Sequence, residues 1–291
     1  MPPEGPPLLR TLVAEPTPDF ALLDSGDGRK LERCGPWRFI RPEPQALWGP
    51  AHSDWAADGE FVGGRDEDGG GRWQLGPHLP GQWPIEQAGV RLHATCTPFR
   101  HLGFFPDMAP HWAELAALPE GAEVLNLFGY TGVASLVAAK AGARVVHVDA
   151  SRKAVEQARA NARLSGLADR PIRWIVEDAR RFVAREGRRG RRYDAILLDP
   201  PKYGRGPEGE VWELGADLPP LLSDCMALLD PGSRFLILTT YAVRLSAHAL
   251  GNLVAALAAH LPGRVEAGEM TLREEARGLL LPTAIYAAWR R

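Results

Sequence analysis

Hydrophobic residues in the C-terminal two-thirds of the chain alternate between short continuous runs and runs with helical spacing. The continuous runs predict buried strands, and apolar residues spaced three and four apart predict amphipathic helices. The expected strands are residues 123–127, 144–148, 172–176, 193–198 and 235–239, and the expected helices are residues 133–141, 152–164, 179–186, 218–229 and 245–260. This regular alternation is typical of an α/β fold with an open, mostly parallel sheet.

The two ends of the chain follow other patterns. Residues 264–272 and 280–289 are strand-like runs without a helix between them, so they predict a terminal antiparallel hairpin. Near the start, short apolar runs alternate with turn-forming clusters, which predicts hairpins. We therefore expect a flexible, proline-rich arm over residues 1–17, a small β-rich domain over 18–97 and the α/β domain over 98–291.

Composition limits the compartment and the partners. Of the 291 residues, 45% are hydrophobic and 24% are charged, which is ordinary for a soluble globular protein. The net charge of −2 gives no overall basic signature of a nucleic-acid binder, although a local patch would suffice. The three cysteines fit no metal-binding spacing, which favours a reducing compartment and predicts no metal. No stretch resembles a signal peptide or a membrane span, so we expect a cytoplasmic protein without a membrane partner.

The stretch from Glu123 to Gly132, E-V-L-N-L-F-G-Y-T-G, is the centre of the predicted α/β domain. It predicts a strand, a turn containing Gly129 and Gly132, and the start of a helix, as in the first half of a nucleotide-binding unit. The helix start at Thr131 offers free backbone N–H groups to a ligand. The full G-x-G-x-x-G is missing, which argues against pyrophosphate binding and leaves an ordinary strand-to-helix turn as the alternative.

Acidic residues end the next two expected strands. Asp149 lies about twenty positions after the glycine turn, where a carboxylate can accept hydrogen bonds from both ribose hydroxyls. Asp178 ends the third strand, where it can accept from an adenine amino group. For both residues, capping of the following helix is the alternative, and for the first helix Ser151 is an equally good cap.

The fourth strand ends in Asp199-Pro200-Pro201-Lys202-Tyr203, a more specific motif. Ligands of open α/β sheets bind at the carboxyl ends of the strands. Because proline has no N–H, the carbonyls of Asp199 and Pro200 are left free to accept from a substrate amine. The two prolines also stiffen a loop that has to hold a reacting group in line, and a purely structural turn is the alternative.

The motifs N-L-F-G-Y-T-G, V-V-H-V-D-A-S, V-E-D-A and L-D-P-P-K-Y resemble those of class I S-adenosylmethionine-dependent methyltransferases. In order and spacing they are similar to the bacterial large-subunit ribosomal RNA methyltransferase family. The resemblance covers residues 101–291 and implies a Rossmann-like, seven-stranded, mostly parallel sheet with an antiparallel last strand. It also implies S-adenosylmethionine as cofactor and RNA, ribosomal RNA in particular, as substrate.

The resemblance assigns a role to each matching residue. It implies that one set binds the cofactor: Asn126, Phe128, Gly129, Tyr130, Thr131 and Gly132 at the methionine end, Asp149 and Ala150 at the ribose, Asp178 and Ala179 at the adenine, Asp199 at the sulfonium, and Phe105 and Asp107 in a covering segment. It implies that Asp199, Pro200, Pro201, Lys202 and Tyr203 form the catalytic motif.

One departure from the family pattern bears on mechanism. Methylation of cytosine at carbon-5 requires a cysteine that attacks the ring, and relatives with that chemistry carry it after the aspartate-proline motif or at the end of the fifth strand. Here these places read Lys202-Tyr203 and Thr239-Thr-Tyr241, and Cys225 falls in a predicted helix. We therefore expect direct, non-covalent transfer to a nucleobase. The motif is closer to the aspartate-proline-proline-aromatic signature of amine methylation, although Lys202 occupies the usual place of the aromatic residue. Tyr203 is suited to stacking on a flipped base, with packing in the loop as the alternative.

Other functions remain open at this stage. The same fold accommodates a protein or small-molecule amine as the methyl acceptor, and a non-catalytic RNA-binding protein would retain it too. A nicotinamide-dependent dehydrogenase is disfavoured by the missing G-x-G-x-x-G. The dense basic run at residues 188–192 is suited to RNA phosphates, but a solvated loop is the favoured interpretation.

Overall fold

A computed structural model describes residues 6–63, 70–241 and 243–291, which form two compact units. The larger unit contains the residues up to Thr11, His111–Glu269 and Ala284–Arg291, and the smaller unit contains Leu12–Pro110 and Met270–Thr283. The division therefore lies near residue 110, not at residue 98, and the smaller unit also takes in a second segment close to the C-terminus.

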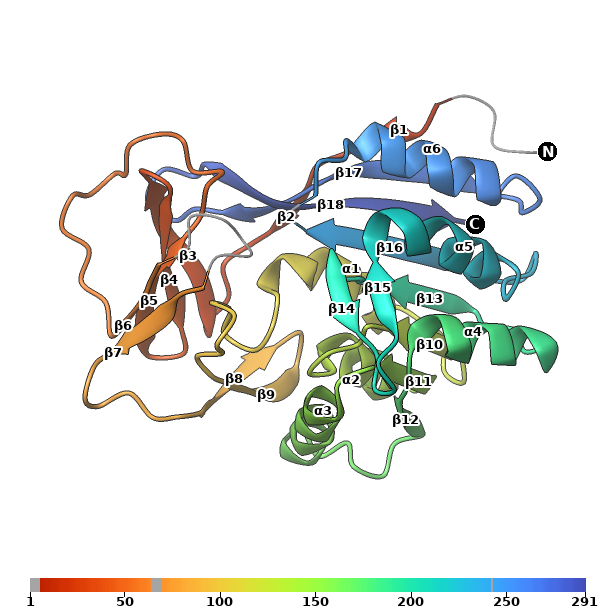
Figure 1. Ribbon diagram of the computed structural model, residues 1–291. Helices are drawn as coiled ribbons and strands as arrows, with labels where there is room; N and C mark the ends of the chain where they lie inside the picture. Colours follow the sequence, from red (N-terminus) through yellow and green to blue (C-terminus); the bar gives the residue numbers. More distant parts are fainter. Residues whose placement is uncertain (1–5, 64–69, 242) are drawn as a thin grey trace. The chain divides into compact units, whose positions relative to one another are not determined.

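A mostly parallel sheet organises the larger unit, as the sequence predicts (Figure 1). Its strands lie in the order β1-β17-β18-β16-β13-β10-β11-β12. Five consecutive strands, from β16 to β12 in this order, pair in parallel, and β18 pairs antiparallel with β16. The strand bounds are β1 Leu8–Leu9, β10 Glu123–Leu127, β11 Arg144–Asp149, β12 Ile172–Val176, β13 Ala195–Leu198, β16 Phe235–Tyr241, β17 Arg264–Arg273 and β18 Leu280–Arg290.

The expected flexible arm is wrong for the described part of residues 1–17. In that segment, β1 pairs in parallel with β17, and β2 (Leu12–Ala14) pairs with the continuation of the same strand. The first five residues of the expected arm lie outside the described part of the chain. Parallel pairing between segments about 255 positions apart leaves no local mark in the sequence, so proline content alone suggested a loose arm.

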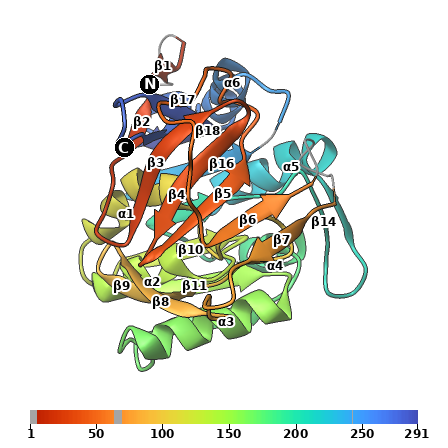
Figure 2. The same cartoon turned by 90° about the vertical axis from the view of Figure 1, so that its left-hand side faces the viewer.

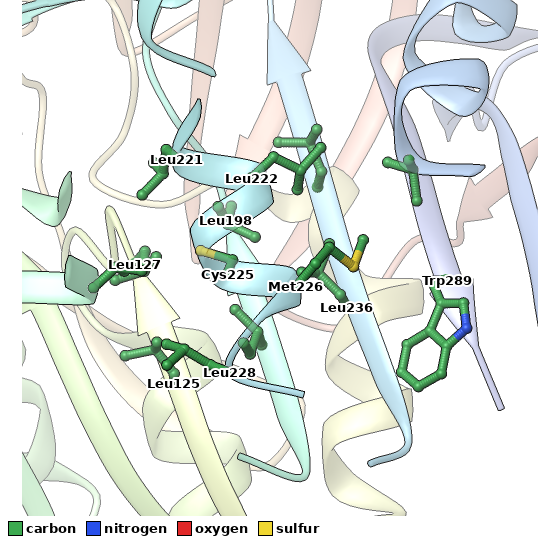
Figure 3. Packing of buried hydrophobic residues seen from close by; sticks show 14 of the residues in the cluster. Leu125, Leu127, Leu198, Leu221, Leu222, Cys225, Met226, Leu228, Leu236 and Trp289 are labelled. Carbon is green, nitrogen blue, oxygen red and sulfur yellow. The ribbon is translucent and has the colours of Figure 1, made fainter. Parts of the chain in front are cut away.

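Helices follow the expected order along the larger unit. Three of them, α4, α5 and α6, share one hydrophobic cluster with the strands (Figure 3). Leu125, Leu198 and Leu236 of three neighbouring strands pack there with Cys225, and each is nearly or fully buried. The helix bounds are α1 Ala109–Ala116, α2 Val133–Lys140, α3 Arg152–Leu164, α4 Ala179–Arg188, α5 Leu214–Met226 and α6 Ala247–Leu257.

The segment after Asp199 differs from the expectation of a loop followed by a helix over residues 218–229. A hairpin of β14 (Tyr203–Arg205) and β15 (Val211–Glu213) comes first, and α5 then begins at Leu214. Pro219 and Pro220 lie inside α5, where their missing N–H groups remove two helical hydrogen bonds. Burial of its leucine-rich face keeps α5 helical despite the prolines.

The smaller unit is rich in β-structure, as predicted (Figure 2). It contains a five-stranded sheet in the order β3-β4-β5-β6-β7 and a separate β8-β9 hairpin. Indole N–H groups of Trp48, Trp55, Trp73 and Trp83 donate hydrogen bonds within this unit, which indicates structural roles for these aromatics. The bounds are β3 Phe20–Gly26, β4 Arg29–Cys34, β5 Trp37–Pro42, β6 Gly59–Val62, β7 Arg72–Leu75, β8 Trp83–Gln87 and β9 Val90–Ala94.

A short 3-10 helix, η1 (Pro106–Met108), follows these strands. Among the helices of residues 6–63, 70–241 and 243–291, none is both long enough and apolar enough to cross a membrane.

Candidate functional site

Three loops meet at the carboxyl edge of the central strands. Leu127 at the end of β10 is in register with Val148 of β11 on one side and with Leu198 of β13 on the other. The glycine turn, Asp149 and Asp199 therefore leave the sheet side by side. Asp178 follows on the next strand, because Asp149 pairs with Val176 at the end of β12. The structure thus brings together the residues that the sequence predicts at the successive strand ends.

The glycine turn has an unusual backbone. Phe128, Tyr130 and Gly132 have φ angles of 56°, 48° and 88°, so two non-glycine residues adopt the left-handed conformation. Each such residue costs free energy, and strain of this kind persists only where the surroundings enforce it. Alternation of left-handed residues also turns successive N–H groups toward one side, as in anion- and ligand-binding turns.

Contacts from two elements enforce this turn. The Asn161 side chain on α3 donates from Nδ2 to the carbonyl of Thr131 at 2.9 Å, and Gly129 N donates to the carbonyl of Val148 at 3.1 Å. Asn161 is fully buried, although nothing in its sequence context marked it as part of the site. The sequence feature that could have identified Asn161 is a polar residue on the apolar face of α3.

A buried polar chain lies beneath the turn. Asn126 Nδ2 donates to Ser135 Oγ at 2.9 Å, and Ser135 Oγ lies 2.9 Å from Nδ1 of His147. Burial lowers the pKa of His147 to about 3, so its ring is neutral at physiological pH. Asn126 is 4% exposed, so its amide is buried with Ser135, and its expected place at the methionine end of the cofactor stays a prediction.

Asp149 is tied to the glycine turn. Its Oδ2 accepts from Tyr130 N at 2.9 Å and its Oδ1 accepts from Ser151 N at 2.8 Å. Burial raises the pKa of Asp149, and these two backbone hydrogen bonds oppose the shift. Ser151, not Asp149, is the N-cap of α3, because its side chain accepts from Ala154 N. Ala150 lies between them and is partly buried.

Asp178 is the N-cap of α4, so the capping interpretation from the sequence is confirmed. Its Oδ1 accepts from Arg181 N at 3.1 Å, and its Oδ2 lies 3.3 Å from Nη2 of Arg180. Ala179 is the buried first residue of the helix. Because Oδ1 accepts from Arg181 N and the guanidinium of Arg180 donates to both oxygens, any adenine contact has to share this carboxylate.

Asp199 is held from the neighbouring strand. Its Oδ1 accepts a hydrogen bond from Oγ1 of Thr239, a fully buried residue of β16. In the sequence, Thr239 is notable only because it stands where relatives with carbon-5 chemistry carry a cysteine. Its role as the residue that orients Asp199 could have been inferred from its place, since β16 ends at the same edge as β13.

The Pro-Pro-Lys-Tyr segment continues from this fixed carboxylate. Pro200 is buried, whereas Pro201 and Lys202 are exposed. The carbonyl of Pro201 accepts from Nε1 of Trp212 at 2.6 Å, and the carbonyl of Lys202 accepts from Leu214 N at 3.0 Å. Tyr203 is 51% exposed at the start of β14, so packing inside the protein does not account for this aromatic side chain.

Phe105 and Asp107 belong to the smaller unit. The ring of Phe105 lies 5.2 Å from that of His101, and Asp107 Oδ2 accepts from Thr283 Oγ1 at 2.6 Å. Burial raises the pKa of Asp107, which the hydrogen bond from Thr283 opposes. Their expected place over the cofactor stays a prediction.

The three cysteines lie in environments that suppress the thiolate. Burial raises the pKa values of Cys34 and Cys96 to about 12 and that of Cys225 further still. Cys225 packs in the hydrophobic cluster of α5 (Figure 3). Within the described ranges of the chain, no group of three or more histidine, cysteine and acidic side chains is arranged to hold a metal ion.

The basic run at residues 188–192 is partly neutralised. Arg189 lies 3.2 Å from a carboxylate oxygen of Glu186, and Arg191 lies within 4 Å of both Glu186 and Glu123. These pairs lower the charge available to RNA phosphates and agree with the solvated-loop interpretation.

Comparison with known proteins points to one family of enzymes. Residues 62–252 match a family model described as S-adenosylmethionine-dependent methyltransferase. The structure is similar to an S-adenosylmethionine-dependent methyltransferase from Agrobacterium tumefaciens, with a TM-score of 0.91, 44% identity and coverage of 98% of this chain and 95% of that chain.

Curated relatives are similar over shorter segments. Ribosomal RNA large subunit methyltransferase I of Shewanella denitrificans is 35% identical over 120 residues, covering 41% of this chain and 30% of the relative. Ribosomal RNA large subunit methyltransferase K/L of Syntrophotalea carbinolica is 31% identical over 170 residues, covering 58% and 23%. This chain thus spans a third or less of the length of these curated relatives.

The packing beneath the turn makes a prediction about Gly129. A Cβ at this position would lie 2.5 Å from Cε1 and Nδ1 of the buried His147, so Gly129→Ala should lower the free energy of unfolding by about 1–3 kcal/mol. Gly187→Ala on α4, where no heavy atom lies within 4 Å of the new Cβ, is the matched control and should be neutral or stabilising. Urea unfolding measures both, and equal stabilities would contradict the close packing.

Proposed function

Because the chain belongs to the S-adenosylmethionine-dependent methyltransferase family, we propose that it methylates a nucleobase of RNA, within ribosomal RNA, by direct transfer without a covalent intermediate. The protein is a methyltransferase, and its cofactor is S-adenosylmethionine. Our proposal concerns its substrate class, the roles of its residues and its mechanism.

The carboxyl edge of the sheet fits the cofactor. Asp149 is the acceptor for the ribose hydroxyls, because its two oxygens accept from the backbone N–H groups of Tyr130 and Ser151 and a carboxylate accepts about four hydrogen bonds. The left-handed turn from Phe128 to Gly132 gives close approach for the methionine end. Asp178 and Ala179 are assigned to the adenine, beside Arg180.

The observation that carries the reaction is the fixed carboxylate of Asp199 followed by an exposed tyrosine. When bound, the cofactor supplies an electrophilic methyl group on its sulfonium. Asp199, oriented by Thr239, accepts a hydrogen bond from the target amine, and the carbonyl of Pro200 is a second acceptor. Tyr203 stacks on the flat base, while Lys202 lies exposed beside it and can contact a phosphate.

Two observations favour RNA as the substrate. The curated relatives are named as methyltransferases of ribosomal RNA. The aromatic side chain at the strand end is also half exposed, and a stacking platform for a flipped base needs such exposure. Methylation of a protein amine is the alternative, and the methyl-transfer assay distinguishes it from methylation of RNA.

The cysteine environments support direct transfer. A covalent mechanism requires a thiolate, yet burial raises the pKa of every cysteine far above physiological pH. Attack by a nitrogen lone pair requires orientation, desolvation and an acceptor for the lost proton. The ordered edge around Asp199 provides orientation and an acceptor.

The first functional prediction concerns Asp149. Asp149→Ala should weaken binding of S-adenosylmethionine and of its demethylated product by about 1.5–3 kcal/mol, because a charged acceptor for two hydroxyls is removed. In the wild type, affinity should also fall as the pH decreases toward the raised pKa of this carboxylate, since protonation removes an acceptor. Calorimetry across the pH range measures both effects.

Asp149→Asn is the control for the pH effect, because its amide does not titrate and its affinity should stay flat over the same range. Wild-type affinity in Asp149→Ala would show that this residue does not bind the cofactor.

The second prediction concerns Asp199 and Tyr203. Asp199→Ala or Tyr203→Ala should lower the methyl-transfer rate by about a hundredfold or more, since both position the base against the methyl group. Cofactor affinity should change little in Tyr203→Ala and moderately in Asp199→Ala. The assay is single-turnover transfer of labelled methyl to total RNA from cells that lack the protein. Wild-type rates in both variants would show that Asp199 and Tyr203 do not form the catalytic centre. Labelled protein without labelled RNA would show that the substrate is a protein.

The third prediction concerns the cysteines. Replacing Cys34, Cys96 and Cys225 together by alanine or serine should preserve turnover per folded molecule, because none supplies a nucleophile. Incubation with RNA containing 5-fluorocytosine should give no adduct that survives denaturation. Detection of such an adduct by gel or mass spectrometry would refute direct transfer.

A further inference from the structure

Trp212 is the buried residue of an otherwise exposed strand. It lies in β15 with 4% of its surface exposed, while Val211 and Glu213 on either side are exposed. The strand has three residues and pairs with β14 in a two-stranded sheet, so backbone pairing alone is a weak constraint. Burial of the indole therefore anchors the hairpin, which leads into α5 (Figure 1), within the larger unit.

The indole of Trp212 contacts three separate parts of the site. Its Nε1 donates to the carbonyl of Pro201 at 2.6 Å, and its ring centroid lies 5.0 Å from that of Phe128 in the glycine turn. The guanidinium of Arg180 lies 5.9 Å from the centroid of the indole. One side chain thus contacts the catalytic motif, the cofactor turn and the start of α4.

Arg180 holds the backbone next to Trp212. Its Nη2 donates to the carbonyl of Val211 at 2.9 Å and lies 3.3 Å from Asp178, and its Nη1 donates to Asp217 at 2.6 Å. The arginine therefore fixes β15 between the N-cap of α4 and the first turn of α5, and this fixes where the indole N–H points.

The chemistry of the Pro-Pro pair makes this N–H important. Pro200 and Pro201 have no backbone N–H, so the segment after Asp199 cannot be held by its own amide donors. It can be held only through its carbonyls and ring contacts. An indole N–H is a donor without acceptor character, and burial of one without an acceptor costs free energy. The carbonyl of Pro201 and the indole of Trp212 therefore satisfy each other.

We propose that Trp212 is a positioning residue of the methyl-transfer site, which holds the Pro200-Pro201 segment through its indole hydrogen bond and thereby sets Asp199 and Tyr203 in line. The activity part of this inference rests on the proposed function. A displacement of about 1 Å at a reacting group can cost about a hundredfold in rate, so loss of this one contact should act on turnover.

Trp212→Phe is the test variant, because it retains an aromatic ring and removes the donor. Trp289→Phe is the matched control: Trp289 is also fully buried in the larger unit, and its Nε1 has no hydrogen-bond partner within the described part of the protein. Replacement of Trp212 by 3-benzothienylalanine, in which sulfur takes the place of the N–H, removes the donor with almost no change in shape.

Hydrogen exchange of peptides covering residues 199–206 gives a readout that is independent of substrate. The amides of Lys202, Tyr203 and Gly204 should exchange about fivefold faster or more in Trp212→Phe and in the benzothienyl variant, and at the wild-type rate in Trp289→Phe. Unchanged exchange in the benzothienyl variant would overturn the proposal, whether or not the phenylalanine variant folds.

Single-turnover and steady-state kinetics give the second readout. Both Trp212 variants should lower kcat about tenfold or more, with KM for RNA and affinity for the demethylated cofactor within about twofold of the wild type. Wild-type kcat in both variants would overturn the positioning role. A wild-type protein that labels no RNA would refute the proposed function instead, and the exchange comparison would still decide whether Trp212 holds the segment.

Discussion

Parallel pairing of β10 with both β11 and β13 is the constraint on which the rest of the site depends. Leu127, the last residue of β10, is in register with Val148 of β11 and with Leu198, the last residue of β13, and this register brings one turn and two carboxylates to one edge. The side-chain period of a strand is two, so a slip of one residue would turn Leu125 and Leu127 out of the hydrophobic cluster. The core that stabilises the sheet therefore also sets the positions of Asp149 and Asp199.

The strained glycine turn depends on a second set of contacts below it. Left-handed conformations at Phe128 and Tyr130 are unfavourable alone, so polar contacts have to enforce them. Asp149 accepts from Tyr130 N above, while the Asn126, Ser135 and His147 chain fills the space below. Asp149 is thus part of the turn before any ligand is considered, and its removal would alter the turn as well as the ribose contact.

The sequence predicted best where the local pattern and the tertiary structure agree. The bounds of β10, α3 and β12 match the expected ranges, because each is a continuous apolar run or a strongly amphipathic stretch with clear ends. Contacts distant in sequence were missed. The pairing of β1 and β2 with β17 has no local signature, and the proline pair inside α5 hid the start of that helix.

The candidate site shows the same division. Strand-end carboxylates were visible because strand ends can be read from the apolar runs. Supporting residues such as Thr239, Asn161 and Trp212 were not, since each acts through a partner more than ten positions away.

An exposed aromatic residue is useful to a base-modifying site only if its backbone is ordered before the substrate arrives. A free segment from Pro200 to Glu213 would lose conformational entropy on binding and weaken the transition-state contacts. Here the hairpin pairs Tyr203 with Glu213, and Arg181 on α4 bonds Glu208 and Glu210 near the hairpin tip. Those ion pairs are exposed and contribute little each. The buried indole of Trp212, which donates to the carbonyl of Pro201, is the stronger constraint that we propose for the segment of the exposed tyrosine.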